Sequence, residues 1–174
     1  MIREYAPIPL IPAAWAMTFA TTTYPLISTY WIEHMHYFML LFLTGFTLLS
    51  WKEMGEDQVL DIWRKVIAAG ILFTAIGALS FAFTEHQFIL GLISISYWFL
   101  APGIALYKSA THMNRYSDLY TKLFYISTIA YAIFLASLII DLEITSYNEL
   151  GIISYILIAA AQTLSIIAAS KMDN

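Results

Sequence analysis

The chain has 174 residues, of which 60% are hydrophobic and only 11% are charged. Its mean hydropathy is +0.73. Because an ordinary soluble domain carries roughly a quarter charged residues, this composition excludes a water-soluble fold and predicts an integral membrane protein. Cysteine is absent, which excludes disulfides, thiolate metal sites, iron-sulfur clusters and cysteine nucleophiles.

Several apolar stretches occur along the chain, each close to the roughly 20 residues that an α-helix needs to cross a bilayer. We predict an all-α fold, a polytopic transmembrane helical bundle with six spans that forms one transmembrane domain over residues 1–174. The predicted spans cover about residues 6–24, 32–51, 62–84, 86–107, 119–140 and 149–170. The first span departs most from the pattern because Pro7, Pro9 and Pro12 lie at its beginning. It is preceded by no basic signal-peptide region, so we expect a retained helix.

The basic residues fall on one side of this predicted topology. With six alternating spans, all eight lysines and arginines lie at the same end of the bundle: Arg3, Lys52, Arg64, Lys65, Lys108, Arg115, Lys122 and Lys171. Because basic loops are retained in the cytoplasm, we expect both the N and C termini to be cytoplasmic. Five spans that begin at the second stretch would leave only Arg3 on the opposite side, so charge supports the first span without proving it.

Polar residues mark several predicted helix ends. The segments 84–87 (Thr-Glu-His-Gln) and 146–149 (Ser-Tyr-Asn-Glu) have the spacing of a capping box, in which two side chains satisfy free backbone amides. Before the third span, Asp61 precedes Lys65 by one helical turn. We therefore expect the third helix to begin in a polar segment outside the membrane.

Small and polar residues indicate how the helices pack, because membrane helices approach closely at such positions. They follow one face of the third span and one face of the sixth: Gly70, Thr74, Gly77 and Ala78, then Ala161, Ser165 and Ala168. Pro102 and Gly103 interrupt the fourth span and predict a bend. Gln162, deep in the sixth span, needs a polar partner, and we expect it to join helices rather than bind a substrate.

Histidines and carboxylates gather on the opposite, outer side of the predicted topology. This outer set comprises Glu33, His34, His36, Glu85, His86, Asp141, Glu143 and Glu149. Glu33 and His36 have the Glu-x-x-His spacing by which helical bundles present ligands to a metal. His34 points elsewhere on the same helix and is an alternative ligand.

Two cofactor hypotheses follow from this set. In the first, a divalent transition metal is bound by imidazole and carboxylate groups of Glu33, His34, His36, Glu85 and His86. In the second, His36 and His86 are the two axial ligands of a haem b. The competing explanation is structural, since acidic residues favour helix N-termini and histidines are common at membrane interfaces. A diiron site would need a second Glu-x-x-His motif, which the sequence lacks.

Familiar catalytic and transport motifs are missing. The sequence has no Walker motif, no His-Glu-x-x-His, no Gly-x-Ser-x-Gly and no mid-span lysine for retinal, so it is not expected to be an enzyme on its own. In length and helix number it is similar to the substrate-binding components of energy-coupling-factor importers. Its histidines on alternate spans are similar in placement to those of membrane b-type cytochromes. Neither likeness includes a diagnostic motif.

Three functions therefore stay open. The leading one is a compact multi-pass subunit or partner in a larger membrane protein assembly, whose partners are the lipid bilayer and other membrane subunits or a second copy, and not nucleic acid. The second is a metal- or haem-binding membrane redox protein that uses the outer set. The third is a component that binds or transports a small, largely neutral solute between its helices.

Overall fold

The computed structural model describes residues 14–20, 28–141 and 149–170 of the chain. The regular structure in these residues is helical throughout, without a strand. The elements are α3 (Thr29–Met54), α4 (Gln58–Ala82), a short 3-10 helix η1 (Thr84–His86), α5 (Gln87–Ala110), α6 (Ser117–Asp141) and α7 (Glu149–Ser170). Residues 14–20 form a further helical segment. Five of the described helices are long and apolar enough to cross a membrane, which confirms the predicted class of membrane helical protein.

The predicted second to sixth spans correspond to these five helices, with ends that differ by a few residues. The predicted first span, 6–24, coincides with described structure only at residues 14–20, which are helical. The rest of that prediction lies outside the described residues. Arg3, Glu143 and Lys171 also lie outside them.

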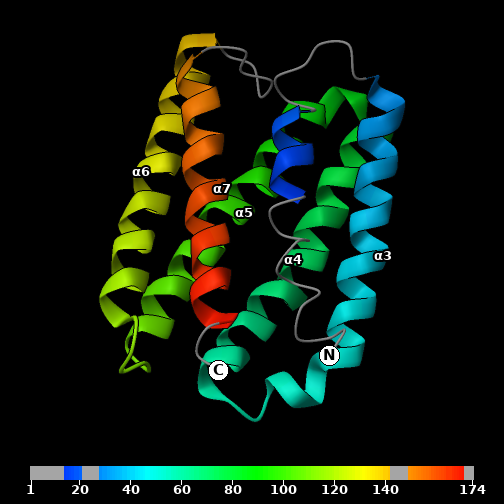
Figure 1. The fold of residues 1–174 in the computed structure, drawn as a ribbon. Coiled ribbons are helices and arrows are strands. Elements are labelled where there is room, and N and C mark those ends of the chain that lie inside the picture. The colour runs from blue at the N-terminus through cyan, green and yellow to red at the C-terminus, as the bar shows by residue number, and fades with distance from the viewer. Residues whose placement is uncertain (1–13, 21–27, 142–148, 171–174) are drawn as a thin grey trace.

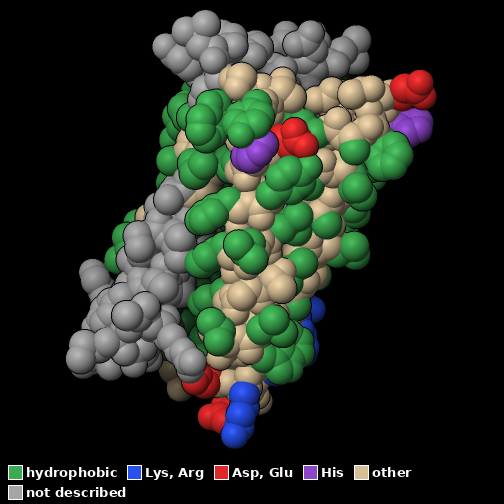
Figure 2. Space-filling model, turned by 90° about the vertical axis from the view of Figure 1, so that its right-hand side faces the viewer, with side chains coloured by type: hydrophobic (Ala, Val, Ile, Leu, Met, Phe, Trp, Pro, Cys, Tyr) green, Lys and Arg blue, Asp and Glu red, His purple; other side chains and the backbone are tan. Residues whose placement is uncertain are grey.

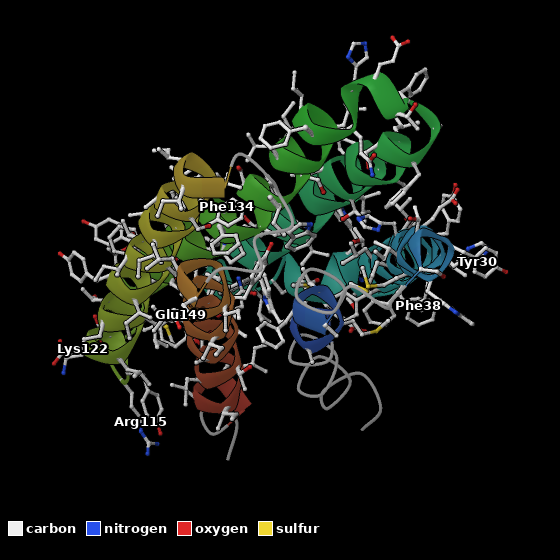
Figure 3. The ribbon with its side chains drawn as sticks, turned by 90° about the horizontal axis from the view of Figure 1, so that it is seen from above. Tyr30, Phe38, Arg115, Lys122, Phe134 and Glu149 are labelled. Carbon is white, nitrogen blue, oxygen red and sulfur yellow. The ribbon has the colours of Figure 1, made fainter. Side chains whose placement is uncertain are left out.

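Successive helices run in opposite directions and pack side by side (Figure 1). α3 packs on α4, α4 on α5, α5 on α6, and α6 on α7. The connections from α3 to α4 and from α5 to α6 lie at the lower end of Figure 1, and η1 lies at the upper end. Residues 14–20 lie near the upper end, between α7 and α3 in the view along the bundle (Figure 3). This order leaves α3 at one edge of the bundle.

Most of the outward-facing surface is apolar. Figure 2 shows hydrophobic side chains along most of the length of the face it presents. On α3, Leu41 and Leu48 are 75% and 74% exposed, and Tyr30 and Phe38 point away from the bundle (Figure 3). Because so many large hydrophobic side chains are exposed along the helices, the surface fits contact with lipid.

The turn between α3 and α4 is held by charged groups. The Asp57 carboxylate accepts hydrogen bonds from the backbone amides of Val59 at 2.8 Å and Leu60 at 2.9 Å, and so caps α4. Asp61 pairs with Lys65 at 2.6 Å and also with Arg64. The predicted pairing of Asp61 with Lys65 is confirmed, and α4 begins before the apolar stretch, as expected.

The predicted capping box at residues 84–87 is wrong. Thr84 instead begins the 3-10 helix η1, and no side chain caps either η1 or α5. The backbone N–H of His86 donates a hydrogen bond to the carbonyl oxygen of Phe83 at 2.9 Å. A tight turn therefore uses its own backbone groups where the sequence pattern indicated a side-chain cap. The second predicted box, 146–149, lies mainly outside the described residues.

The predicted small-residue faces are buried, as expected. Gly70, Thr74, Gly77 and Ala78 are buried on α4, and Ala161, Ser165 and Ala168 are buried on α7. A Cβ atom added to Gly70 would lie 2.6 Å from the Trp98 ring, so glycine is what lets α5 place an indole against α4.

An aromatic cluster fills the space between α5, α6 and α7. The Phe99 ring lies 4.9 Å from that of Phe134 and 5.6 Å from that of Tyr155, measured between centroids. Trp15 joins them with its ring 5.5 Å from Phe99, and only 6% of it is exposed. Phe134 lies inside the bundle in Figure 3. The helical segment 14–20 is thus fixed to the bundle by a buried indole.

Candidate functional site

A cavity of about 670 Å³ lies between α3, α4, α5, α7 and residues 14–18. This volume is in the range of small-molecule sites. Most of its walls are apolar or aromatic, with thioethers of Met35 and Met39 and rings of Phe42 and Phe46 from α3. Its polar lining residues are Thr18, His36, Thr74, Ser80, Thr84, Glu85, Gln87, Ser94 and Gln162. Among the described lining residues there is no lysine or arginine.

The cavity is elongated along the helices. On α4 it is lined from Trp63, near the lower end, to Phe81, near the upper end. These residues are roughly 27 Å apart along a helix that rises about 1.5 Å per residue. The space thus extends over most of the length of α4, which is comparable with the roughly 30 Å of a bilayer core.

One wall of the cavity depends on a hydrogen-bond arrangement around Pro102. Proline has no N–H, so the carbonyl oxygen of Trp98, four residues earlier in α5, loses its usual helical donor. The Gln162 amide nitrogen on α7 donates to this oxygen at 3.2 Å. The Gln162 side-chain oxygen accepts from the Trp15 indole nitrogen at 2.7 Å. One amide therefore joins α5, α7 and residues 14–20, and the expectation that Gln162 joins helices is confirmed.

Trp98 is held from the other side by α4. Its indole N–H donates to the Thr74 hydroxyl oxygen at 3.2 Å, and its ring lies over Gly70. Its position is therefore fixed by two helices, with the indole forming part of the cavity wall. Both Thr74 and Gly70 belong to the small-residue face of α4.

Three helices meet at Gly77, near the upper part of the cavity. A Cβ atom built on Gly77 would lie 2.6 Å from the Ser94 hydroxyl oxygen of α5 and 3.2 Å from the Cδ2 atom of the His36 ring on α3. His36 and Ser94 both line the cavity, and Ser94 is only 7% exposed. An imidazole and a hydroxyl are thus brought to one place because α4 carries no side chain there.

Glu33, His34 and His36, at the start of α3, do not all face the same side of the helix. His34 faces outward, with its ring 3.9 Å from that of Tyr30. The Glu33 carboxylate accepts a hydrogen bond from the Tyr37 hydroxyl at 2.6 Å, on the exposed surface. His36 faces inward, 5.2 Å from the Phe81 ring. Neither Glu33 nor His34 lines the cavity.

Glu85 and His86 lie at the upper end, in the exposed 3-10 helix η1. Glu85 lines the mouth of the same cavity as His36, whereas His86 lines a separate small hollow with Phe83 and Thr84. Within the described parts of the chain, no three histidine, aspartate or glutamate side chains are close enough to hold a metal ion. His36 and Glu85 are therefore the two predicted site residues that share one cavity.

The other cavity residues had weak signals in the sequence. Ser94 and Thr74 look like ordinary small residues of membrane helices, and nothing in their spacing points to His36. Trp15 and Trp98 have a stronger signal, because a tryptophan deep in a span requires a partner for its N–H group. Gln162 supplies that partner for Trp15.

Comparisons with known proteins identify no relative: no family model, curated protein or solved structure matches the chain.

Replacing Gln162 with leucine should destabilise the protein by about 1 kcal/mol or more, because two buried polar groups lose a partner. The loss should be smaller when Pro102 is already alanine, since the new backbone N–H can donate to the Trp98 oxygen. Unfolding free energies of the four proteins, measured in one detergent by denaturant titration, form a double-mutant cycle that tests this.

Trp15→Phe serves as the control for this cycle. It removes the indole donor but not the Trp98 oxygen bond, so its cost should be the same with proline or alanine at position 102. Equal costs for Gln162→Leu in both backgrounds would show that the bond to Trp98 contributes nothing.

Proposed function

We propose that the protein binds a small, uncharged and mainly apolar molecule between its helices, within the membrane. The observation that carries this proposal is the elongated cavity bounded by α3, α4, α5, α7 and residues 14–18. Ligand sites are typically concave, mostly apolar and provided with a few polar groups, and this cavity has each of these properties.

The charge of the lining favours a neutral ligand. Apart from Glu85 and the imidazole of His36, the polar groups of the lining are hydroxyls, amides and indole N–H groups. Glu85 lies in exposed η1, at the end of the cavity. An anion inside would lack a cationic partner, and a buried charge without a partner is costly in a membrane. The ligand is therefore expected to enter uncharged.

Of the functions predicted from sequence, this is the third, binding or transport of a small neutral solute. Membership of a larger membrane assembly and a metal or haem site in the outer set remain predictions that no contact among the described residues favours.

We also propose that the lower end of the bundle is cytoplasmic. The described basic residues lie in or near the connections that join α3 to α4 and α5 to α6: Lys52, Arg64, Lys65, Lys108, Arg115 and Lys122. Figure 2 shows lysine and arginine at the lower end of the face it presents and histidine near the upper end. Figure 3 shows Arg115 and Lys122 on the outside of the bundle. Basic ends are retained in the cytoplasm.

Single cysteines test this orientation without interference, because the chain has none of its own. His86→Cys and Asn114→Cys place a thiol in exposed positions at the upper and lower ends. A membrane-impermeant maleimide added to intact cells should label position 86 directly and position 114 only after permeabilisation. The reverse pattern would show that the lower end lies outside the cytoplasm. Labelling of both positions in intact cells would contradict their placement on opposite sides of the membrane.

Tryptophan fluorescence offers a direct test of binding. Trp15, Trp63 and Trp98 line the cavity, whereas Trp31 and Trp51 do not and are 66% and 47% exposed. In a Trp31→Phe/Trp51→Phe protein in nanodiscs, bound 1-bromodecane should quench the remaining indoles, because bromine quenches indole emission on contact. This quenching should reach a plateau as the concentration of 1-bromodecane is raised. Quenching by brominated phospholipid should instead increase with the bromine content of the bilayer.

A matched pair of double variants separates the cavity from the lipid-facing surface. Met39→Phe/Val66→Phe adds two rings to the cavity lining and should weaken binding by about tenfold, the factor that corresponds to about 1.4 kcal/mol. Leu41→Phe/Leu72→Phe adds the same rings on the exposed faces of α3 and α4 and should leave binding unchanged. Non-saturating quenching, or equal effects of the two pairs, would refute the proposal.

A further inference from the structure

The hydrogen-bonding state of His36 is fixed by its own helix. Its Nδ1 atom lies 2.8 Å from the carbonyl oxygen of Ile32. A carbonyl oxygen only accepts, so Nδ1 carries the proton of the neutral ring. The second ring nitrogen, Nε2, is then an acceptor. Among the described residues nothing donates a hydrogen bond to it.

The Ser94 hydroxyl is the complementary group. Ser94 as a whole residue is 93% buried and lines the cavity, and no hydrogen bond joins its hydroxyl oxygen to any part of the chain that the structure describes. A hydroxyl both donates and accepts. A hydroxyl and an acceptor nitrogen that do not bond each other in an apolar site each lack a partner, which is unfavourable unless a bound group bridges them.

The other polar groups nearby are already engaged. The Ser80 hydroxyl donates to the carbonyl oxygen of Gly77 at 2.6 Å. The Thr74 hydroxyl oxygen accepts from Trp98. The polar groups that meet beside Gly77 without a hydrogen bond to another described residue are therefore Nε2 of His36 and the hydroxyl of Ser94.

We propose that the meeting point of His36, Gly77 and Ser94 is the head-group site of the cavity, and that the ligand is a long, uncharged alcohol or phenol. The ligand hydroxyl donates to Nε2 of His36 and accepts from the hydroxyl of Ser94. This inference rests on the proposed function and specifies its ligand class.

The rest of the ligand follows from the shape of the cavity. His36 lies about two turns below the start of α3, and the apolar walls continue from there to Phe46 and Trp63. A hydrocarbon or isoprenoid chain attached to the hydroxyl fits this elongated space. The polar end of the ligand would lie nearer η1, at the upper end of the bundle. Its apolar end would extend towards the lower end of the bundle.

The donor and acceptor pattern also separates alcohols from related amphiphiles. A ketone, quinone or ether oxygen only accepts, so it satisfies Ser94 and leaves Nε2 of His36 unpaired. A buried polar group without a partner weakens binding considerably. The site therefore prefers an alcohol or phenol to the ether or ketone of the same length.

The test uses the full chain with Trp31→Phe/Trp51→Phe in nanodiscs and three probes: 10-bromodecan-1-ol, its methyl ether, and 1-bromodecane. From saturable tryptophan quenching, corrected for partition into the bilayer, the alcohol should bind roughly tenfold more tightly than the ether. His36→Phe should remove most of this preference, because only the alcohol donates to Nε2. Ser94→Ala should weaken the alcohol and the ether by a similar factor, because both accept from the Ser94 hydroxyl. Both changes should leave the binding of 1-bromodecane within about twofold of its original value.

Ser80→Ala is the matched control, because Ser80 also lines the cavity but its proton is already donated to Gly77. The alcohol and the ether should therefore both bind the Ser80→Ala protein as tightly as the protein with Ser80. His36→Phe retains an aromatic ring against Phe81, which protects the packing of α3.

The outcomes separate this inference from the proposed function. Equal binding of alcohol and ether, with saturable binding of 1-bromodecane, overturns the head-group site and leaves the proposed function standing. A preference that persists in His36→Phe, or alcohol and ether binding that Ser94→Ala leaves unchanged, also overturns it. Absence of saturable binding by all three probes overturns the proposed function itself.

Discussion

The carbonyl oxygen of Trp98 sets the main constraint on this bundle. Pro102 deprives it of a backbone donor in an apolar environment, where a missing hydrogen bond is costly. Gln162 of α7 supplies the donor, and its own oxygen accepts from Trp15. α5, α7 and residues 14–20 are consequently held at one point. The same Trp98 residue is fixed against Gly70 and Thr74 of α4, so the constraint reaches four segments.

The cavity is a consequence of this arrangement. α4, α5, α6 and α7 pack in sequence, with buried aromatic rings between α5, α6 and α7, whereas α3 packs mainly on α4. Space is left between α3 and the segment that Trp15 holds to α7, and methionines and phenylalanines of α3 line it. At Gly77 the three helices α3, α4 and α5 come close enough to place His36 beside Ser94. A wall joined by hydrogen bonds and an edge helix that packs mainly on one neighbour thus bound one elongated, mainly apolar space.

The sequence predicted the helices well and the site only in part. Hydropathy located the five long helices, and spacing identified the small-residue faces and the pairing of Asp61 with Lys65, because these features depend on local periodicity. The capping box at Thr84 failed because a 3-10 turn uses the same residues differently. His34 and His36 were grouped with Glu33, yet only His36 faces the interior, and its neighbour Ser94 comes from a helix whose rotation no local pattern reveals. The pairing of Gln162 with Trp15 likewise depends on tertiary packing.

Mass spectrometry of the intact protein, released from its native membrane under gentle conditions, tests the account most directly. We expect a stoichiometric bound molecule that is uncharged, mainly hydrocarbon and carries a free hydroxyl detectable by acetylation after extraction. A protein that is released at its bare mass while still folded, or one that carries a metal ion or a haem instead, would contradict it.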